Sequence, residues 1–164
     1  MTETIRLAEE SELPELRQIA IAAIGSPSSD YNERQTSAWL ASFPEEDAWL
    51  ERLSEQQIVV ALSKRGGATI GFMTLRNDGL IDFAFILPLH QGQGHFRALV
   101  EKIEAIARIA GMPRLSAKAS RNAINPFIAS GFTKTGREVI ALDTVELERF
   151  HVLKELSFRS KVNQ

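Results

Sequence analysis

An apolar strand that runs into a glycine-bearing loop and then a helix constrains this chain more than any other feature. The segment is Ile86–Leu99, ILPLHQGQGHFRAL, in which Pro88 ends the strand and the helix begins near Gln93. The first turn of a helix has N–H groups without intrahelical partners and lies at the positive end of the helix dipole. Gly92 and Gly94 lack Cβ atoms, so main-chain donors there can approach an anion closely. The segment therefore predicts a main-chain cradle for a diphosphate.

Taken alone, a G-x-G turn between a strand and a helix has a second interpretation, a plain tight connection. Two familiar nucleotide-binding motifs do not fit the segment. No Gly-Lys-Ser/Thr ending follows the loop, and no G-x-G-x-x-G follows the first strand of the chain.

Hydrophobic periodicity predicts one α/β domain over residues 1–164, with a mixed sheet of about seven strands and helices on both faces. The expected strands are Thr4–Ala8, Ile58–Leu62, Thr69–Leu75, Leu80–Leu87, Arg114–Lys118, Phe132–Leu142 and Val145–Leu156. The expected helices are Glu12–Ile24 with Ser11 as its N-cap, Asn32–Ala41, Glu45–Ser54, the helix from Gln93, and Asn122–Ala129.

Charge is distributed unevenly along the chain. Residues 1–60 contain 4 Lys or Arg against 12 Asp or Glu, and residues 61–164 contain 15 against 9. Solvated helix faces would explain this, and so would an anionic ligand on the second part with a cationic one facing the first. No basic run is interleaved with aromatic residues, so we expect no nucleic-acid partner.

Composition also limits the class of protein. The chain has no cysteine, and His90, His95 and His151 lack metal-ligand spacing, so we expect no metal site. No apolar stretch approaches the roughly 20 residues that span a bilayer. The first residues, MTETIRLAEE, do not resemble a signal peptide, and we therefore expect a cytoplasmic protein without membrane contact.

The glycine loop resembles motif A of the GNAT acetyltransferase superfamily, (Gln/Arg)-x-x-Gly-x-(Gly/Ala) after a strand that ends Val-x-Pro. Gln91 and Gly94 match the first and fourth motif positions, and Ile86-Leu87-Pro88 matches the end of the strand. Downstream, Ala119–Ala123 and the residues around Phe127 resemble motif B, with its A-x-x-x-(Tyr/Phe)-x-x-x-G-F spacing.

The segment from Tyr31 to Trp39 is similar to the second-helix region of a bacterial subgroup of small-molecule N-acetyltransferases. The resemblance covers nearly the whole chain. It implies residues 1–60 on the acceptor side, and an acyl-CoA-binding core with a C-terminal hairpin over residues 61–164.

The resemblance implies acetyl-CoA as the acyl donor. Its pyrophosphate would lie on the amides of residues 92–97, and its pantetheine arm would lie along the strand where the sheet splays. The implied cofactor-binding residues are Phe85, Ile86, Leu87, Gln91, Gly92, Gln93, Gly94, His95, Phe96, Arg97, Ser120 and Arg121.

Two residues depart from the family pattern. Phe96 occupies a position where the family prefers Gly or Ala; it either belongs to the apolar stripe of the helix or points into the cradle and weakens binding. Phe127 stands where many members have a tyrosine that protonates the CoA thiolate. The remaining proton donors are Tyr31, Ser120 and a bound water, although Tyr31 would also suit a packing role.

Asp82 is the candidate general base for the direct attack of an amine on the thioester. It is the one charge in an apolar strand, two residues after Leu80, where some family members place a catalytic glutamate. A hydrogen bond to a nearby loop would be its structural explanation. Asp30, Glu33 and Asp47 are candidates to attract a cationic acceptor.

The resemblance implies an acyltransferase that moves an acetyl group from acetyl-CoA to a primary amine of a small molecule. Two other interpretations stay open: a GNAT-fold module that binds CoA or a metabolite without turnover, and a protein or peptide N-acetyltransferase. The terminal hairpin is compatible with a homodimer.

Overall fold

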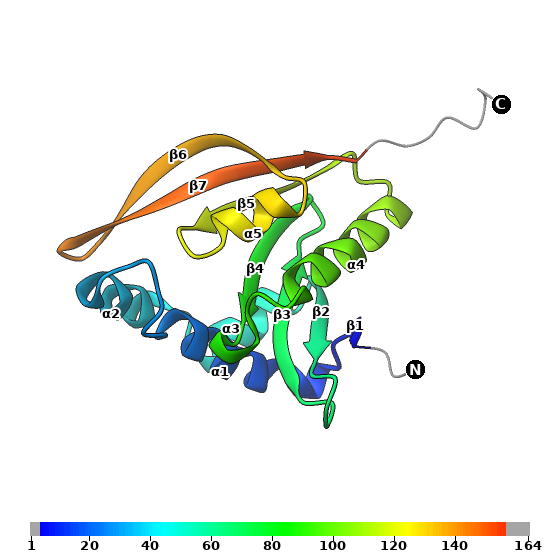
Figure 1. Ribbon diagram of the computed structural model, residues 1–164, viewed down its shortest axis with the longest axis horizontal. Coiled ribbons are helices and arrows are strands. Elements are labelled where there is room, and N and C mark those ends of the chain that lie inside the picture. The colour runs from blue at the N-terminus through cyan, green and yellow to red at the C-terminus, as the bar shows by residue number, and fades with distance from the viewer. Residues whose placement is uncertain (1–3, 157–164) are drawn as a thin grey trace.

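A single seven-stranded mixed sheet forms the centre of the molecule in the computed structural model, which describes residues 4–156 (Figure 1). The strand order is β1-β2-β3-β4-β5-β7-β6, and only the β4–β5 pair is parallel. The strands are β1 (Ile5–Leu7), β2 (Gln57–Leu62), β3 (Thr69–Leu75), β4 (Leu80–Ile86), β5 (Arg114–Ser120), β6 (Thr133–Leu142) and β7 (Val145–Glu155). The sheet confirms the predicted α/β fold class.

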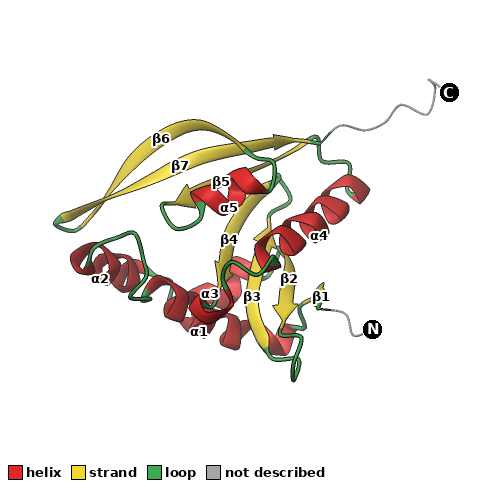
Figure 2. Cartoon of the chain, viewed as in Figure 1, coloured by secondary structure: helices red, strands yellow, loops and turns green. Residues whose placement is uncertain are grey.

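Helices cover both faces of the sheet, as Figure 2 shows. They are α1 (Leu13–Ile24), α2 (Glu33–Ser42), α3 (Glu46–Leu53), α4 (His95–Ile109) and α5 (Ile124–Ala129), with 3-10 turns η1 (Glu10–Glu12) and η2 (Pro88–His90). Ser11 lies inside η1, so its prediction as the N-cap of α1 is wrong. Asn32 instead caps α2, because its side chain accepts a hydrogen bond from the Gln35 amide at 2.8 Å.

Two hydrophobic cores lie on opposite faces of the sheet. The apolar stripe of α4, which includes Leu99 and Ile103, packs with Phe127 of α5 on one face. On the other face α1 and α3 pack around Trp49, which is fully buried and donates its indole N–H to the Leu13 carbonyl at 2.7 Å. The two cores hold β3 and β4 firmly between them.

The parallel strands β4 and β5 pair only at their first residues, where Leu80 faces Ser116 and Ile81 faces Ala117. Gly79 makes this start possible: it has a φ of 89°, and an added Cβ would lie 2.6 Å from the Arg114 carbonyl oxygen. Beyond residue 81 the two strands separate, since β5 pairs with β7 over its full length. The sheet therefore opens in its middle, and the β5-facing edge of the rest of β4 has no strand partner.

The long β6–β7 hairpin reaches from the open sheet to α2 (Figure 1). Asp143, with a φ of 54°, forms its turn. The Gln35 side chain donates to the Glu146 carbonyl at 2.8 Å, and Arg34 donates to the Thr144 hydroxyl at 3.3 Å. The far end of the hairpin is thus fixed to the N-terminal helices.

Candidate active site

The N-terminus of α4 presents a row of main-chain donors in open space. Gly94, its N-cap, has a φ of 88°, and Gly92 has a φ of 74°. A Cβ added to either glycine would meet no atom within 4 Å. Within residues 4–156, no hydrogen bond uses the amides of residues 92–97. Since the first turn of α4 contains no acidic side chain, the cradle combines free N–H groups with an uncompensated helix dipole.

Hydrogen bonds of two polar side chains connect the cradle to the neighbouring elements β4 and α5. The Gln91 side chain donates to the Ile86 carbonyl at 3.0 Å and so joins the loop to the end of β4. The Arg97 guanidinium donates to the Ala129 carbonyl at 2.5 Å, which ties α4 to the end of α5. These contacts fix where the amides point.

Phe96 packs into the core beside the cradle. Its ring meets Phe127 edge-on, with centroids 4.9 Å apart, and Phe127 meets Phe132 in the same way at 5.0 Å. Of the two interpretations of Phe96, the contacts support the core residue. The three rings together form the wall between α4, α5 and the start of β6.

A cavity of about 420 Å³ lies in front of the cradle, between β4, α5 and the loop after α1. Of the residues implied to bind the cofactor, those that line it are Phe85, Ile86, Gln91, Gly92, Gly94, His95, Phe96, Arg97 and Ser120.

Three residues of the implied cofactor set lie outside this cavity. Leu87 packs between the two cores, and its amide donates to the Ile70 carbonyl at 2.8 Å. The Gln93 side chain is exposed and donates to the Leu89 carbonyl at 3.2 Å. Arg121 is turned toward β7, as described below. The main-chain contacts expected at Leu87 and Gln93 stay predictions, whereas the Arg121 guanidinium pairs with Glu148.

Asn122 and the loop of residues 26–30 form a wall of the cavity that the sequence did not predict. The Asn122 side chain accepts from the Asp30 amide at 2.7 Å and donates to the Ser29 hydroxyl at 3.1 Å. Ser29, Asp30 and Asn122 all line the cavity. The serine-rich composition of the loop indicates a turn, but no local pattern identifies its distant partner.

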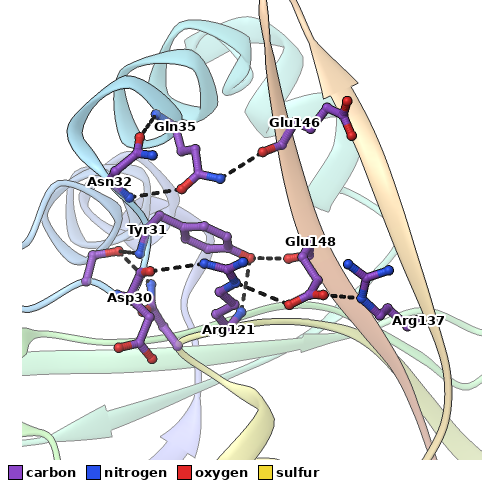
Figure 3. A network of polar contacts seen from close by, with 10 residues as sticks. Asp30, Tyr31, Asn32, Gln35, Arg121, Arg137, Glu146 and Glu148 are labelled. Atoms are coloured by element: carbon purple, nitrogen blue, oxygen red, sulfur yellow. Dashed lines mark hydrogen bonds and ion pairs between the residues drawn. The ribbon is translucent and has the colours of Figure 1, made fainter.

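A polar network around Tyr31 joins this loop to the hairpin (Figure 3). The Tyr31 hydroxyl donates to the Glu148 carbonyl at 2.5 Å and accepts from the Arg121 amide at 3.0 Å. The Arg121 guanidinium donates to the Glu148 carboxylate at 3.2 Å, and Arg137 pairs with the same carboxylate. Burial raises the pKa of Tyr31. The hydroxyl therefore holds two structural bonds, and the Arg121 charge is used away from the cradle.

A second cavity, of about 440 Å³, lies on the other side of the opening in the sheet. Its lining includes Tyr31, Asp82 and Phe83, together with residues of the hairpin. The residues that line both cavities are Trp39, Ala84, Phe85, Ser120 and Ala123. The two cavities thus meet at the point where β4 and β5 separate.

Ser120 lies at this junction, at the end of β5. Its side chain is partly buried, and its hydroxyl makes no hydrogen bond to any residue within 4–156. Among the three proton donors considered from the sequence, Ser120 has the free hydroxyl, whereas that of Tyr31 is engaged.

Asp82 lines the second cavity with a side chain that is only 7% exposed. One carboxylate oxygen accepts from Arg52 at 2.8 Å, and the other accepts from Arg52 at 3.0 Å and from Gln56 at 2.8 Å. Of the acidic residues expected to attract a cationic acceptor, Asp30 lines the first cavity, and Glu33 and Asp47 line neither cavity.

Residues 4–156 contain no group of three or more side chains suited to hold a metal ion, and none of their helices is long and apolar enough to cross a membrane.

Sequence comparison identifies the family to which this geometry belongs. The model of the acetyltransferase (GNAT) domain family matches residues 27–142, which include the cradle, the Asp82 strand and Ser120. The chain belongs to the GNAT acetyltransferase family. This confirms the resemblance that motifs A and B indicated. No curated protein sequence matches the chain significantly.

Solved structures of GNAT enzymes have the same fold. A GCN5-related N-acetyltransferase from Rhodopseudomonas palustris is 25% identical, with a TM-score of 0.84 over 95% of this chain and 97% of that one. The PaiA N-acetyltransferase from Thermoplasma acidophilum, in complex with coenzyme A, is 15% identical, with a TM-score of 0.74 over 95% of this chain and 100% of that one. A phosphinothricin acetyltransferase from Sinorhizobium meliloti, in complex with acetyl-CoA, is 23% identical, with a TM-score of 0.71 over 95% and 89%.

Proposed function

We propose that this GNAT enzyme transfers the acetyl group of acetyl-CoA to a primary amine of a small molecule by direct attack. The observation that carries the proposal is the meeting of two cavities at Ser120. One of them contains the main-chain cradle, and the other contains a nearly buried carboxylate. The fold neighbours from Thermoplasma and Sinorhizobium, which hold coenzyme A or acetyl-CoA, support this choice of donor.

The first cavity fits an acyl-CoA because free main-chain amides and an unpaired strand edge border it. The free amides of residues 92–97 suit a diphosphate, and the open space in front of Gly92 and Gly94 leaves room for it. The unpaired edge of β4 beyond Ile81 suits the amides of the pantetheine arm. Acetyl-CoA bound in this way supplies the activated thioester at the junction.

The reaction forms a bond between the amine nitrogen and the acetyl carbon and breaks the carbon–sulfur bond of the thioester. Holding both reactants in line is worth about 7–11 kcal/mol of the barrier. Asp82, acting through water, removes a proton from the ammonium so that the nitrogen can attack. The free Ser120 hydroxyl gives a proton to the leaving thiolate. The nitrogen loses its second proton after the attack, and this proton restores the Ser120 hydroxyl through solvent, while the proton on Asp82 is released.

The walls of the second cavity favour a small acceptor over a protein. Leu142 and Leu147 of the hairpin and Phe43 and Pro44 after α2 line the same cavity. The bond between Gln35 and the Glu146 carbonyl holds these two elements together. A peptide segment would need an open groove at this position.

Phe127 favours an alternative, a GNAT-fold module that binds acyl-CoA without turnover. This phenylalanine replaces the proton-donating tyrosine of many family members, and it is 2% exposed. The alternative requires an intact cradle but no acetyl transfer.

A pair of glycine variants tests the cradle. Gly94 and Gly111 have φ values of 88° and 76°, and an added Cβ meets no atom at either site. Gly94→Ala and Gly111→Ala should therefore each cost about 1–2 kcal/mol of folding free energy. Acetyl-CoA at about 100 times its Kd should raise the melting temperature of the wild type by roughly 5–10 °C. We expect Gly94→Ala to lose most of this shift and Gly111→Ala to keep it.

Equal shifts in both variants would contradict the cradle, and no shift in the wild type would contradict acyl-CoA binding altogether. Release of CoA thiol with a panel of small amines and peptides then separates the three interpretations. Turnover with small amines supports the proposal, turnover with peptides alone favours a protein acetyltransferase, and binding without turnover favours the binding module.

A further inference from the structure

The second cavity has a basic lining, although it lies on the acceptor side of the molecule. Arg52, Arg76, Lys118 and Arg149 all line it, and Asp82 is the one acidic residue among its lining residues. A site that selected an amine by its positive charge alone would need carboxylates facing the cavity, since like charges disfavour binding. The lining indicates an acceptor that also carries negative charge.

The three arginines of this lining already have acidic partners. Arg52 pairs with Asp82 at 2.8 Å, Arg76 pairs with Asp78 at 2.6 Å, and Arg149 pairs with Glu138. Their charges are largely balanced within the protein.

Lys118 differs from the arginines because it has no partner. Its side chain is exposed, and it makes no ion pair or hydrogen bond within residues 4–156. Its ammonium group is therefore the cation of this cavity that is free to bind an anionic group on a ligand.

The register of the sheet places Lys118 close to Ser120, at the junction of the two cavities. Lys118 and Ser120 are two residues apart on β5, so their side chains lie on the same face about 7 Å apart along the strand. Arg149 of β7 lies opposite Ser120 on that face. A ligand whose amine reaches the junction at Ser120 can therefore place a neighbouring anionic group at Lys118.

Apart from Tyr31, Ser42 and Ser120, the rest of the lining is apolar. Phe43, Phe83 and Leu147 contribute to the walls, and Trp39 stands at the junction with the first cavity. The Phe83 ring is additionally covered by the Arg52 guanidinium at 4.5 Å from its centroid. Such walls suit an apolar side chain rather than a sugar or a polyamine.

We infer that the acceptor is an α-amino acid with an apolar side chain, whose carboxylate is bound by Lys118. The inference rests on the proposed acetyl transfer and names the substrate class for it. The α-amine is next to its carboxylate, which matches the adjacent positions of Ser120 and Lys118. The product is an N-acetyl amino acid, in which the carboxylate stays bound while the charge of the amine is lost.

Matched acceptors test this substrate class. Phenylalanine, phenylalanine amide and phenethylamine have the same skeleton and differ at the carboxylate, and leucine with its amide and isopentylamine forms a second set. Release of CoA thiol from acetyl-CoA gives kcat and KM for each. We expect kcat/KM for the amino acids to exceed that of the amides and amines by about 10-fold or more.

Substitution of Lys118 tests the binding group. Lys118→Met should raise KM for the amino acids by about 10-fold, leave the amides unchanged and leave the acetyl-CoA thermal shift unchanged. Lys118→Arg should keep the preference. Lys102→Met, an exposed lysine on α4, is the matched control and should change nothing.

The outcomes separate this inference from the proposed function. Equal turnover of acids, amides and amines, preference for polyamines, or a Lys118→Met variant that keeps the preference would overturn the inference while leaving acetyl transfer intact. Acetyl-CoA binding without turnover of any amine would overturn both.

Discussion

The proposed role of Ser120 as proton donor depends on its hydroxyl making no structural hydrogen bond within residues 4–156. Its neighbours on the chain are engaged: the Arg121 amide donates to Tyr31, and the Ser120 carbonyl accepts from the Ala123 amide at 3.1 Å. The Ser120 hydroxyl makes no hydrogen bond to any residue within 4–156 and lies at the junction of the two cavities. A free hydroxyl at the thioester can donate a proton without breaking a structural bond.

Ser120→Ala should lower kcat by about 10- to 100-fold, because the thiolate would then leave without a positioned proton. The thermal shift with acetyl-CoA should stay unchanged, since the cradle is intact. Ser116→Ala, on the same face of β5 but outside both cavities, is the matched control. An unchanged kcat in Ser120→Ala would assign the proton to water.

His95 makes the stability of the cradle depend on pH. It is 8% exposed at the start of α4, with the His90 ring 6.3 Å away. Burial lowers the pKa of His95 below its ordinary value of 6.5, and the charges of His90 and Lys64 lower it further. Below about pH 6.5 the unfolded chain therefore binds more protons than the folded one, and stability falls as the pH falls.

His95→Gln should weaken this dependence. We expect the fall in melting temperature between about pH 7.5 and about pH 5.5 to be smaller in the variant than in the wild type. His90→Gln, which removes one of the two neighbouring charges, should give an intermediate fall. Identical pH profiles for all three proteins would show that His95 does not titrate in this range.

At the scale of elements, Tyr31 connects three segments that are distant in the sequence. Its hydroxyl links the loop before α2 to β7 and to the turn after β5 (Figure 3). Its ring also meets Trp39 edge-on at 5.6 Å. The hairpin, which lines the acceptor cavity, is therefore held by this residue as well as by α2.

Tyr31→Phe should destabilise the fold by about 1–3 kcal/mol, because the Arg121 amide and the Glu148 carbonyl lose a partly buried partner. We expect kcat to change less than about threefold, since Ser120 supplies the proton. Thr135→Ala removes an exposed hydroxyl bond from β6 to the His151 carbonyl on β7, the strand that also contains Glu148, and should cost under about 0.5 kcal/mol. A large loss of kcat at normal stability would instead identify Tyr31 as the proton donor.

The elements themselves could be predicted wherever the signal is local. The expected strand Thr69–Leu75 is found with the same bounds, because an apolar run between two glycine turns defines it. The helix expected from Gln93 begins at His95, since Gly94 has a positive φ and must stay outside it. The free amides at the start of α4 were predictable for the same reason, as they all lie in one short segment.

The side-chain directions in the site could not be predicted, because they depend on distant partners. Arg121 was expected at the cradle but pairs with Glu148, 27 residues further along the chain. Asn122 forms a wall of the first cavity through Asp30, which lies 92 residues away. The pairing of β7 with β5 brings Glu148 to Arg121, and the packing of the loop after α1 against the turn after β5 brings Asp30 to Asn122.

At the scale of the whole molecule, the acidic first part and the basic second part meet at the acceptor cavity. Residues 1–60 carry a net charge of −8, and residues 61–164 carry +6. The pairs Arg76–Asp78, Arg121–Glu148 and Arg149–Glu138 lie within the second part. Arg52–Asp82 joins the two parts, between α3 and β4. This ion pair fixes the N-terminal helices against the strand that borders both cavities.

Variants of this ion pair separate its structural and chemical roles. Asp82→Asn keeps an acceptor for Arg52 but cannot take a proton, so kcat/KM should fall by about 100-fold near neutral pH. Its rate should rise steadily with pH, because the acceptor amine must then lose its proton in solution. Arg52→Met keeps the carboxylate but leaves it with Gln56 alone, so the fold should lose about 1–3 kcal/mol while kcat/KM stays within about fivefold. Pre-steady-state thiol release over a range of pH, with melting temperatures of both variants, measures the two effects. If both variants lost stability alike and Asp82→Asn kept the wild-type rate and pH profile, Asp82 would serve only to hold Arg52, and the amine would reach the thioester already deprotonated.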